Sequence, residues 1–263
     1  MLNFCSLYSG STGNSLFIES ENTKLLIDAG VSGKKIIDGL ISINSSINYI
    51  DGILVTHEHS DHITSIGTLS KKYNIPVYAT KKTWSALGAQ KEYIKKENRK
   101  LFNMCEKFEI NDFKIFPFST PHDAIDSCGF NIYKDNVKIS IATDLGHVTN
   151  KIYNYLENSL LVFLESNYEP ELLKYSSYPF IIKKRIASND GHLSNIDAAK
   201  TILKLIPSGL KTIFLGHLSR ENNFPELVKK TIINELLENN YDINSLSLNI
   251  ARLDTPSKLI KIS

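Results

Sequence analysis

Apolar residues occur along this chain in short runs separated by turn-forming residues, a pattern that predicts many β-strands. An unbroken run such as residues 52–56 is typical of a strand that is buried on both faces. The predicted strands cover residues 3–8, 16–19, 24–27, 52–56, 75–78, 113–118, 129–133, 137–143, 160–164 and 212–215. Several of them run directly into His, Asp or Glu, so we expect polar side chains to gather at one edge of a buried sheet.

Helical spacing of apolar positions fills most of the gaps between these strands. The predicted helices cover residues 33–41, 60–73, 80–100, 195–205 and 225–238. Ser32 is the expected N-cap of the first helix, and Ser60 or Asp61 that of the second. No repeat, linker or low-complexity tract divides the sequence, so we expect residues 1–263 to form a single domain.

Composition adds few constraints beyond a globular character. The 263 residues are 42% hydrophobic and 22% charged, and the formal net charge of +2 gives no overall signal for a polyanionic partner. No run of about 18 apolar residues is present, and the N-terminus is not a basic segment followed by an apolar one, so we expect a cytoplasmic protein without a membrane partner. Cys5, Cys105 and Cys128 lack C-x-x-C spacing, so we expect buried thiols rather than disulfides or a thiolate zinc site.

The densest chemical signal is the segment H57-E-H-S-D-H62, which directly follows the predicted strand 52–56. It holds three imidazoles and two carboxylates within six residues. His57, His59 and Asp61 can project from a turn while His62 starts the next helix, so one segment can serve two neighbouring metal ions. Imidazole and carboxylate ligands suit Zn, Mn or Fe rather than Ca or Mg.

Two such ions about 3.5–4 Å apart need roughly six to eight donors and a bridging carboxylate. Further donors follow other predicted strands: His122 in T120-P-H-D123, Asp144 in A142-T-D-L-G146, and one or more of the later histidines. The sequence therefore predicts a site for two divalent ions, Zn or Mn.

The chain resembles the metallo-β-lactamase-fold hydrolases in a series of motifs that spans nearly its whole length. The series comprises T56-H-E-H-S-D-H62, the aspartate of L26-I-D-A-G30, His122, Asp144 and His217. Four further stretches are similar to the YycJ/WalJ-type family: S9-G-S-T-G-N14, Y178-P179 with K183-K-R185, G191-H-L-S-N195, and H217-L-S with Asn222-Asn223. The resemblance implies an α+β fold, a four-layer αββα sandwich of two mixed sheets flanked by helices.

The resemblance also implies how two metal ions would share the donors. One ion would be held by His57, His59 and His122. The other would be held by Asp61, His62 and His217. Asp144 and a hydroxide would bridge the two ions, and Asp28 would orient the site without binding metal. Alternatively, Asp28 is simply a turn residue before Gly30.

Three later stretches resemble the nuclease branch of these hydrolases: F163-L-E-S166, G191-H-L-S194 and F214-L-G-H-L-S219. The resemblance implies that His192 is a general acid, that Glu165 orients it, and that His217 is a ligand; Asp61 is counted among the catalytic residues. Metal ions supply hydroxide and neutralise phosphoryl charge, but they do not protonate a departing alkoxide, which a histidine with a pKa near neutrality can do. A helix-capping His192 and a surface acid at Glu165 remain alternatives.

The tetrapeptides G191-H-L-S, G216-H-L-S and G146-H-V-T are alike, and we attribute the shared glycine to a sharp turn at a strand end. His147 in the third is expected to be a polar lining or capping residue, with substrate contact as the minority interpretation.

Six residues outside the metal site are candidates for substrate binding: Ser9, Ser11, Asn14, Tyr178, Lys183 and Arg185. The first three belong to a Ser/Gly-rich turn that could present backbone N–H groups to a phosphate or could simply join two strands. The basic triplet at 183–185 could grip a phosphate or form a solvated face. Tyr175, Tyr178 and Phe180 could stack on a terminal base, although such aromatics more often belong to a core or a turn.

The YycJ/WalJ resemblance implies a DNA exonuclease that acts from 5′ ends by metal-hydroxide attack on a phosphodiester. Only 22 positions separate His122 from Asp144 and 73 separate Asp144 from His217. This leaves little space for a long tRNA-holding arm and none for a large inserted cap domain. Two alternatives stay open: a small-molecule metallohydrolase acting on a thioester, lactone or cyclic nucleotide, and an inactive metal-bound regulatory protein. No protein partner is inferred.

Overall fold

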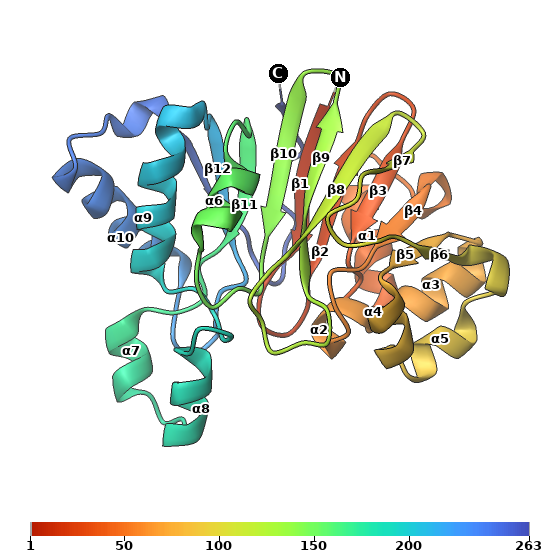
Figure 1. The fold of residues 1–263 in the computed structure, drawn as a ribbon, viewed down its shortest axis with the longest axis horizontal. Helices are drawn as coiled ribbons and strands as arrows, with labels where there is room; N and C mark the ends of the chain where they lie inside the picture. The colour runs from red at the N-terminus through yellow and green to blue at the C-terminus, as the bar shows by residue number, and fades with distance from the viewer. Residues whose placement is uncertain (1, 263) are drawn as a thin grey trace.

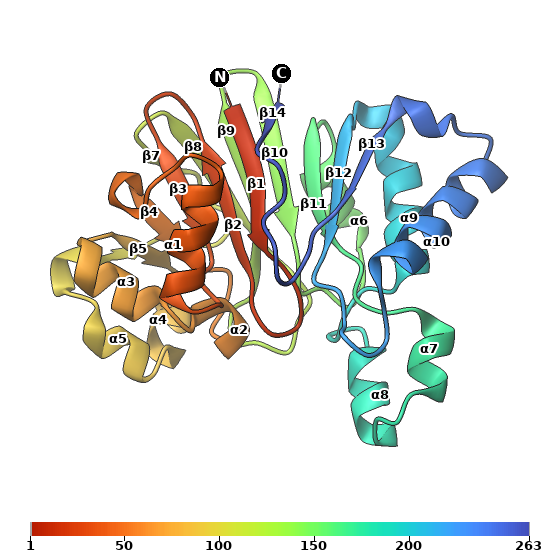
Figure 2. The same cartoon turned by 180° about the vertical axis from the view of Figure 1, so that it is seen from behind.

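Two seven-stranded sheets face each other in the computed structural model, and helices cover the outer face of each sheet (Figures 1 and 2). The structure describes residues 2–262. This arrangement is the predicted four-layer αββα sandwich, and both sheets mix parallel and antiparallel neighbours. No helix among residues 2–262 combines the length and the apolar character needed to cross a membrane.

The first sheet has the strand order β14-β1-β2-β3-β4-β5-β6. Its strands are β1 (Leu2–Tyr8), β2 (Ser15–Glu19), β3 (Lys24–Ile27), β4 (Gly52–Leu54), β5 (Val77–Ala79), β6 (Arg99–Leu101) and β14 (Ile260–Ile262). From β3 to β6 the neighbours are parallel. Their carboxyl ends therefore meet at one edge of the molecule.

The second sheet has the order β13-β12-β11-β10-β9-β8-β7. Its strands are β7 (Phe108–Ile110), β8 (Phe113–Ser119), β9 (Cys128–Lys134), β10 (Val137–Ala142), β11 (Leu161–Glu165), β12 (Thr212–Gly216) and β13 (Ser247–Ile250). Strands β10 to β13 are parallel. Strand β8 runs the same way because it and β10 are both antiparallel to β9.

Three apolar cores hold the layers together. Phe4 of the first sheet packs between the sheets against Phe163 and Phe214 of the second, with ring centroids 5.9 and 5.0 Å away. The outer cores join each sheet to its helices. The helices over the first sheet are α1 (Gly33–Ser42), α3 (Ile66–Tyr73), α4 (Lys81–Ala86) and α5 (Ala89–Tyr93). Those over the second are α6 (Asn150–Leu156), α9 (Asn195–Leu205) and α10 (Pro225–Glu238).

The expected helix over 60–73 is in fact two helices, α2 (Ser60–Ile63) and α3. The chain breaks between them because Ser65 makes tertiary contacts: its N–H donates to the Ala29 carbonyl at 2.9 Å, and its hydroxyl donates to the Val31 carbonyl. The N-cap of α2 is His59, without a side-chain capping bond, so neither Ser60 nor Asp61 caps it.

The Lys-rich stretch 80–100 is also divided. Helix α4 ends at Ala86, Gly88 adopts a φ of 53°, and α5 follows. The stretch then closes as strand β6, which pairs with β5. The indole of Trp84 donates to the Lys100 carbonyl at 2.9 Å and ties α4 to β6. Sheet pairing thus overrides the helical composition at the end of the stretch.

Cys105 is exposed, contrary to the expectation of three buried thiols, because it lies in the turn before β7 with a φ of 61°. Cys5 and Cys128 are buried.

Helix α6 was not predicted from the sequence. Two further helices, α7 (Pro170–Tyr175) and α8 (Phe180–Ile186), were also not predicted. They extend away from the sandwich on the side of α2, as both ribbon views show (Figures 1 and 2).

Candidate metal centre

Polar side chains follow six strands at the shared edge of the two sheets. Asp28 follows β3, the segment 56–62 follows β4, and His122 follows β8. On the second sheet, Asp144 follows β10, Glu165 ends β11 and His217 follows β12. The structure thus brings together all seven residues expected to bind metal, in overlapping groups whose donor atoms lie within 4.8 Å of one another.

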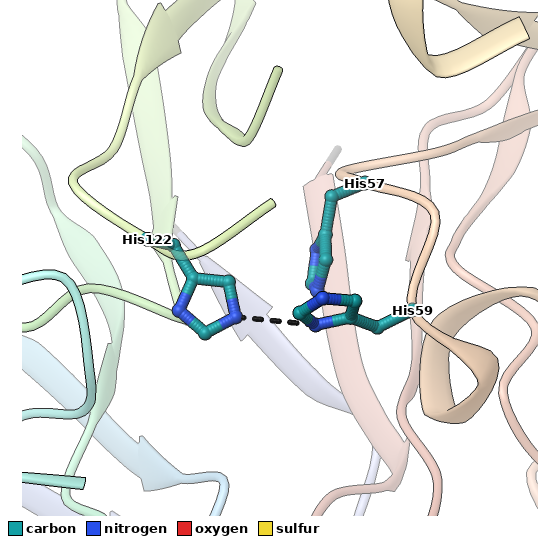
Figure 3. A group of neighbouring side chains, drawn as sticks. All are labelled: His57, His59 and His122. Atoms are coloured by element: carbon teal, nitrogen blue, oxygen red, sulfur yellow. Dashed lines mark hydrogen bonds between the residues drawn. The ribbon is translucent and has the colours of Figure 1, made fainter. Parts of the chain in front are cut away.

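The first group comprises His57, His59 and His122 (Figure 3). His57 and His59 extend from the loop after β4, and His122 extends toward them from the loop after β8. Nε2 of His122 lies 3.3 Å from Nδ1 of His59. Two nitrogens each about 2.0–2.1 Å from a tetrahedral zinc ion are about 3.3–3.4 Å apart. This spacing fits a metal ion shared by the two rings.

The second group comprises Asp61, His62 and His217. Oδ2 of Asp61 lies 3.3 Å from Nε2 of His62 and 3.4 Å from Nε2 of His217. Asp144 lies between the two groups, because its Oδ2 is 3.2 Å from Nε2 of His62 and its Oδ1 is 3.6 Å from Nε2 of His122. Asp144 is therefore positioned to contact ions on both sides.

Two buried atoms at the centre have no hydrogen-bond partner within residues 2–262: Nε2 of His57 and Oδ2 of Asp144. A buried donor or acceptor left unpaired costs free energy, so such atoms indicate a ligand. Burial, reinforced by the nearby His62, holds the pKa of His57 well below its usual value, which favours the neutral, metal-binding form. Burial works against ionised Asp144, but His217 and His62 outweigh it and hold its pKa well below the usual value. The donor set thus fits divalent metal ions.

Asp28 fixes the orientation of two of these histidines. Its Oδ2 accepts from Nδ1 of His62 and from the Thr56 hydroxyl, both at 2.7 Å, and its Oδ1 accepts from the Thr56 N–H at 2.8 Å. Because the Thr56 hydroxyl donates to Asp28, it is an acceptor for Nδ1 of His57, 3.0 Å away. In the neutral, metal-binding form of each ring, these acceptors hold the Nδ1 proton, and an unprotonated Nε2 faces the metal centre.

We expect Asp28→Asn to weaken metal binding by about 10–100-fold, because the amide cannot accept all the hydrogen bonds that the carboxylate accepts. Metal retained after dialysis against graded chelator measures the change. Asp38→Asn, on the exposed side of α1, is the matched control and should bind metal as the wild type does. Equal metal retention in both variants would contradict the orienting role of Asp28.

Glu165 is fully buried and accepts four hydrogen bonds. Its Oε1 accepts from Nδ1 of His192 at 2.8 Å and from Nδ1 of His217 at 2.7 Å. Its Oε2 accepts from the N–H groups of Leu145 and Leu193 at 2.9 and 3.3 Å. Burial raises the pKa of this carboxyl, but the two histidines outweigh it and the pKa is lowered, so Glu165 stays ionised. One carboxylate therefore orients both histidines.

A further donor group consists of Asp144, Glu165, His192 and His217. In it the Nδ1 atoms of both histidines are already bonded to Glu165, which leaves Nε2 of each ring for other partners. Nε2 of His217 lies near Asp61 and its side chain is only 2% exposed, whereas the side chain of His192 is 17% exposed. This group therefore supports the metal centre rather than forming a third ion site.

Backbone conformation is unusual at three of the site residues. Asp28, Asp144 and His217 have φ values of 61°, 55° and 57°, in the left-handed region that non-glycine residues rarely adopt. Each residue directly follows a strand or comes shortly after it, so the backbone turns sharply where the side chain must face the site. Such strain is typical of functional sites.

The glycines before His147, His192 and His217 do not supply these turns, contrary to the expectation, since none has a positive φ. They allow close packing instead. A Cβ on Gly146 would lie 2.2 Å from the Asn189 carbonyl oxygen, and one on Gly191 would lie 2.2 Å from that of Arg185. His147 itself contacts the Asn189 carbonyl through Nδ1 at 2.9 Å and is not among the residues that line the metal pocket.

A pocket of about 270 Å³ opens over the metal ligands and contains Ser11, Tyr178 and Arg185. Three other expected substrate contacts lie elsewhere. Ser9 is buried, and its hydroxyl accepts from the His217 N–H at 2.8 Å; the buried Asn14 amide reaches Oδ2 of Asp61 at 3.3 Å. Lys183 faces away from this pocket and donates to the Lys174 carbonyl at 2.8 Å. Ser9 and Asn14 thus support ligands rather than a substrate surface.

Sequence reasoning missed three residues that position the site. Besides Thr56, Asn167 donates to the His217 carbonyl at 2.7 Å. Asp123 pairs with Arg185 and lies 3.4 Å from Nε2 of His122. Thr56 and Asp123 carried some signal, because each stands in a quoted motif next to an expected ligand, whereas Asn167 carried none.

Comparisons with known proteins agree with this arrangement. Residues 23–214 match the β-lactamase superfamily domain. The chain is 40% identical over 234 residues to exodeoxyribonuclease WalJ of Streptococcus pneumoniae serotype 2 (strain D39 / NCTC 7466), covering 88% of this chain and 87% of the relative. It is 37% identical over 242 residues to exodeoxyribonuclease YycJ of Bacillus anthracis, covering 92% of each. The metallo-β-lactamase fold protein YhfI from Bacillus subtilis superposes with a TM-score of 0.73 at 17% identity, covering 98% of this chain and 100% of that one, which shows the shared fold.

Proposed function

The chain belongs to the β-lactamase superfamily and, within it, to the family of the WalJ and YycJ exodeoxyribonucleases, and from this premise we propose that it is a metal-dependent DNA exonuclease. The observation that carries the proposal is the Glu165 carboxylate bonded to both His192 and His217. A proton donor held beside a metal ligand suits the hydrolysis of an unactivated phosphodiester, whose leaving oxygen needs a proton. As part of the proposal, digestion starts from 5′ ends.

Two divalent ions, Zn or Mn, fit the two donor groups described above. The first would be held by His57, His59 and His122, and the second by Asp61, His62 and His217, with Asp144 between them. When bound, such ions lower the pKa of water and neutralise charge on phosphoryl oxygens. The imidazole and carboxylate donors suit Zn and Mn, as they also suit Fe.

Protonation of the leaving oxygen and binding of the substrate strand are assigned to side chains of the protein. Nδ1 of His192 is engaged by Glu165, so Nε2 is the nitrogen available to give a proton to the leaving oxygen of a phosphodiester in the pocket. Glu165 accepts a hydrogen bond from Nδ1 and holds that ring in one orientation. Arg185, Tyr178 and Ser11 line the same pocket and are proposed to contact the substrate strand.

Metal removal should abolish activity and DNA should be the preferred substrate. The test uses a panel of 5′-phosphorylated duplex DNA, single-stranded DNA, RNA and a lactam, assayed with the dialysed protein, with EDTA, and after adding back Zn or Mn. We expect cleavage of DNA to vanish in EDTA and to return with metal. Elemental analysis should give two ions per chain.

The same panel distinguishes the alternatives. If no nucleic acid is cut with Zn or Mn supplied, the nuclease proposal is lost; turnover of the lactam alone would favour a small-molecule hydrolase. End-labelled DNA reports the polarity, since release of the 5′ label as a mononucleotide at the earliest times is expected only for digestion from the 5′ end.

A further inference from the structure

Helices α7 and α8, with the turn between them, form an arm beside the metal pocket (residues 170–186; Figures 1 and 2). One side of α8 faces this metal pocket, and Ile182, Arg185 and Ile186 of the helix line it. The other side faces a groove of about 630 Å³ between α7 and α8. A polymer that occupies the catalytic pocket therefore needs to cross only one helix to enter the groove.

The arm exposes large apolar side chains. Phe180, Tyr175 and Ile181 are 81%, 75% and 73% exposed, and Phe180 also lines the groove together with Leu173. Single exposed apolar residues are ordinary on a protein surface. Several on one short arm next to a catalytic pocket indicate a binding surface.

The charge of the arm is positive. Residues 170–186 contain one acidic residue, Glu171, and four basic residues, Lys174, Lys183, Lys184 and Arg185. Lys174 lies 3.6 Å from Glu171, and Lys183 donates to the Lys174 carbonyl at 2.8 Å. Lys184 is exposed and lines the groove beside Phe180 and Lys183. Aromatic faces interspersed with ammonium groups suit a chain that carries both π-faces and phosphates.

We propose that the groove between α7 and α8 is a subsite for unpaired DNA, in which bases stack on Phe180 while Lys183 and Lys184 contact the backbone. The proposal rests on the nuclease function proposed above and extends it. A duplex shields the faces of its bases, so an apolar, aromatic groove favours a single strand. Because α8 lines both the pocket and the groove, one strand fills both at once, and the enzyme holds substrate beyond the scissile phosphate.

The test compares KM for 5′-phosphorylated single-stranded oligonucleotides of 2 and 20 nucleotides. In the wild type, the longer substrate should have the lower KM. Phe180→Ala and Lys184→Glu should each raise KM for the 20-mer about tenfold and leave the KM of the dinucleotide within twofold, so that the length preference collapses. Both side chains are exposed, so the fold should be preserved, which thermal unfolding checks.

Matched controls are Tyr49→Ala, whose side chain is 65% exposed beside the first sheet's helices, and Lys34→Glu on α1. Both should keep the length preference. Arm variants that also keep it would overturn the proposal. So would vesicle binding that Phe180→Ala abolishes without any change in DNA length preference, measured with phosphatidylcholine–phosphatidylglycerol vesicles, since the arm would then be a lipid surface.

Fluorescence anisotropy with a labelled 20-mer separates this proposal from the nuclease function. A wild type that binds the 20-mer through Phe180 and Lys184 but cuts no DNA would refute only the nuclease function. A wild type that cuts DNA while the arm variants bind the 20-mer equally well would refute only the groove.

Discussion

Replacing His192 with alanine should leave the metal content unchanged and slow DNA hydrolysis by about 10²–10⁴-fold, the usual contribution of a positioned general acid. The imidazole is bonded to Glu165 through Nδ1 and lines the pocket, where it can reach a leaving oxygen. An alkoxide leaving group needs that proton, whereas p-nitrophenolate does not. The variant should therefore hydrolyse bis(p-nitrophenyl) phosphate at close to the wild-type rate.

His217→Ala should behave differently, because Nε2 of His217 lies among the proposed metal ligands, 3.4 Å from Oδ2 of Asp61. We expect this variant to lose metal from the second group and to hydrolyse both DNA and the nitrophenyl ester more slowly than the wild type. His147→Ala is the matched control, since His147 lies on the same edge but does not line the pocket. It should keep both metal and rate.

Two measurements decide between these roles: metal per chain by elemental analysis, and the rate ratio between DNA and the nitrophenyl ester. Equal metal loss in His192→Ala and His217→Ala would make His192 a ligand. Equal slowing of both substrates in His192→Ala would remove its role as proton donor, because a defect in leaving-group protonation must depend on the leaving group.

The elements that the sequence predicts well are those whose own residues decide their structure. Helix α9 spans the predicted residues, because Ser194 caps it by accepting from the Asp197 N–H and its buried Ala198, Ile202 and Leu205 follow helical spacing. The stretches 60–73 and 80–100 were predicted as single helices because their local composition is helical. Contacts from Ser65 to the β3–α1 loop and from β6 to β5 decide the outcome there, and such contacts leave no local trace.

The same distinction applies to the site. Donor types and their places after strands indicated the 57–62 segment, His122 and Asp144 as candidate ligands. The family resemblance added His217, and the structure brings all seven expected ligands together. The bond from Glu165 to His217 and the path from Asp28 through Thr56 to His57 join residues whose hydrogen-bond geometry no spacing encodes. Ser9 and Asn14 were expected to contact substrate because glycine-rich turns often bind phosphate, but this turn folds inward and its polar groups are used by the ligands.

Glu165→Gln should be the most damaging conservative substitution in the chain. The buried carboxylate accepts from four N–H donors, two on each oxygen. In the amide, either Nδ1 of both histidines or the N–H groups of Leu145 and Leu193 would face an NH₂ group that cannot accept. Two donors are left unpaired at a site of 0% exposure, at a cost of about 1–3 kcal/mol each.

Both functions supported by Glu165 should therefore fail together. We expect kcat on DNA to fall on the order of 10³-fold, metal affinity to fall by about 10–100-fold, and the unfolding temperature to drop by several degrees. Glu109→Gln, at an exposed position on β7, is the matched control and should change none of these.

Because both roles depend on one carboxylate, the rate losses of the single variants should not combine independently. A purely structural role of Glu165 does not predict this. If Glu165 acts on the proton through His192, the double variant Glu165→Gln/His192→Ala should be only slightly slower than the worse single variant when metal is saturating. If the two residues acted independently, the fold-losses in rate of the two single variants would instead multiply. A multiplicative loss would show that Glu165 supports catalysis by a route other than His192, and a Glu165→Gln protein with wild-type rate and metal content would remove its role altogether.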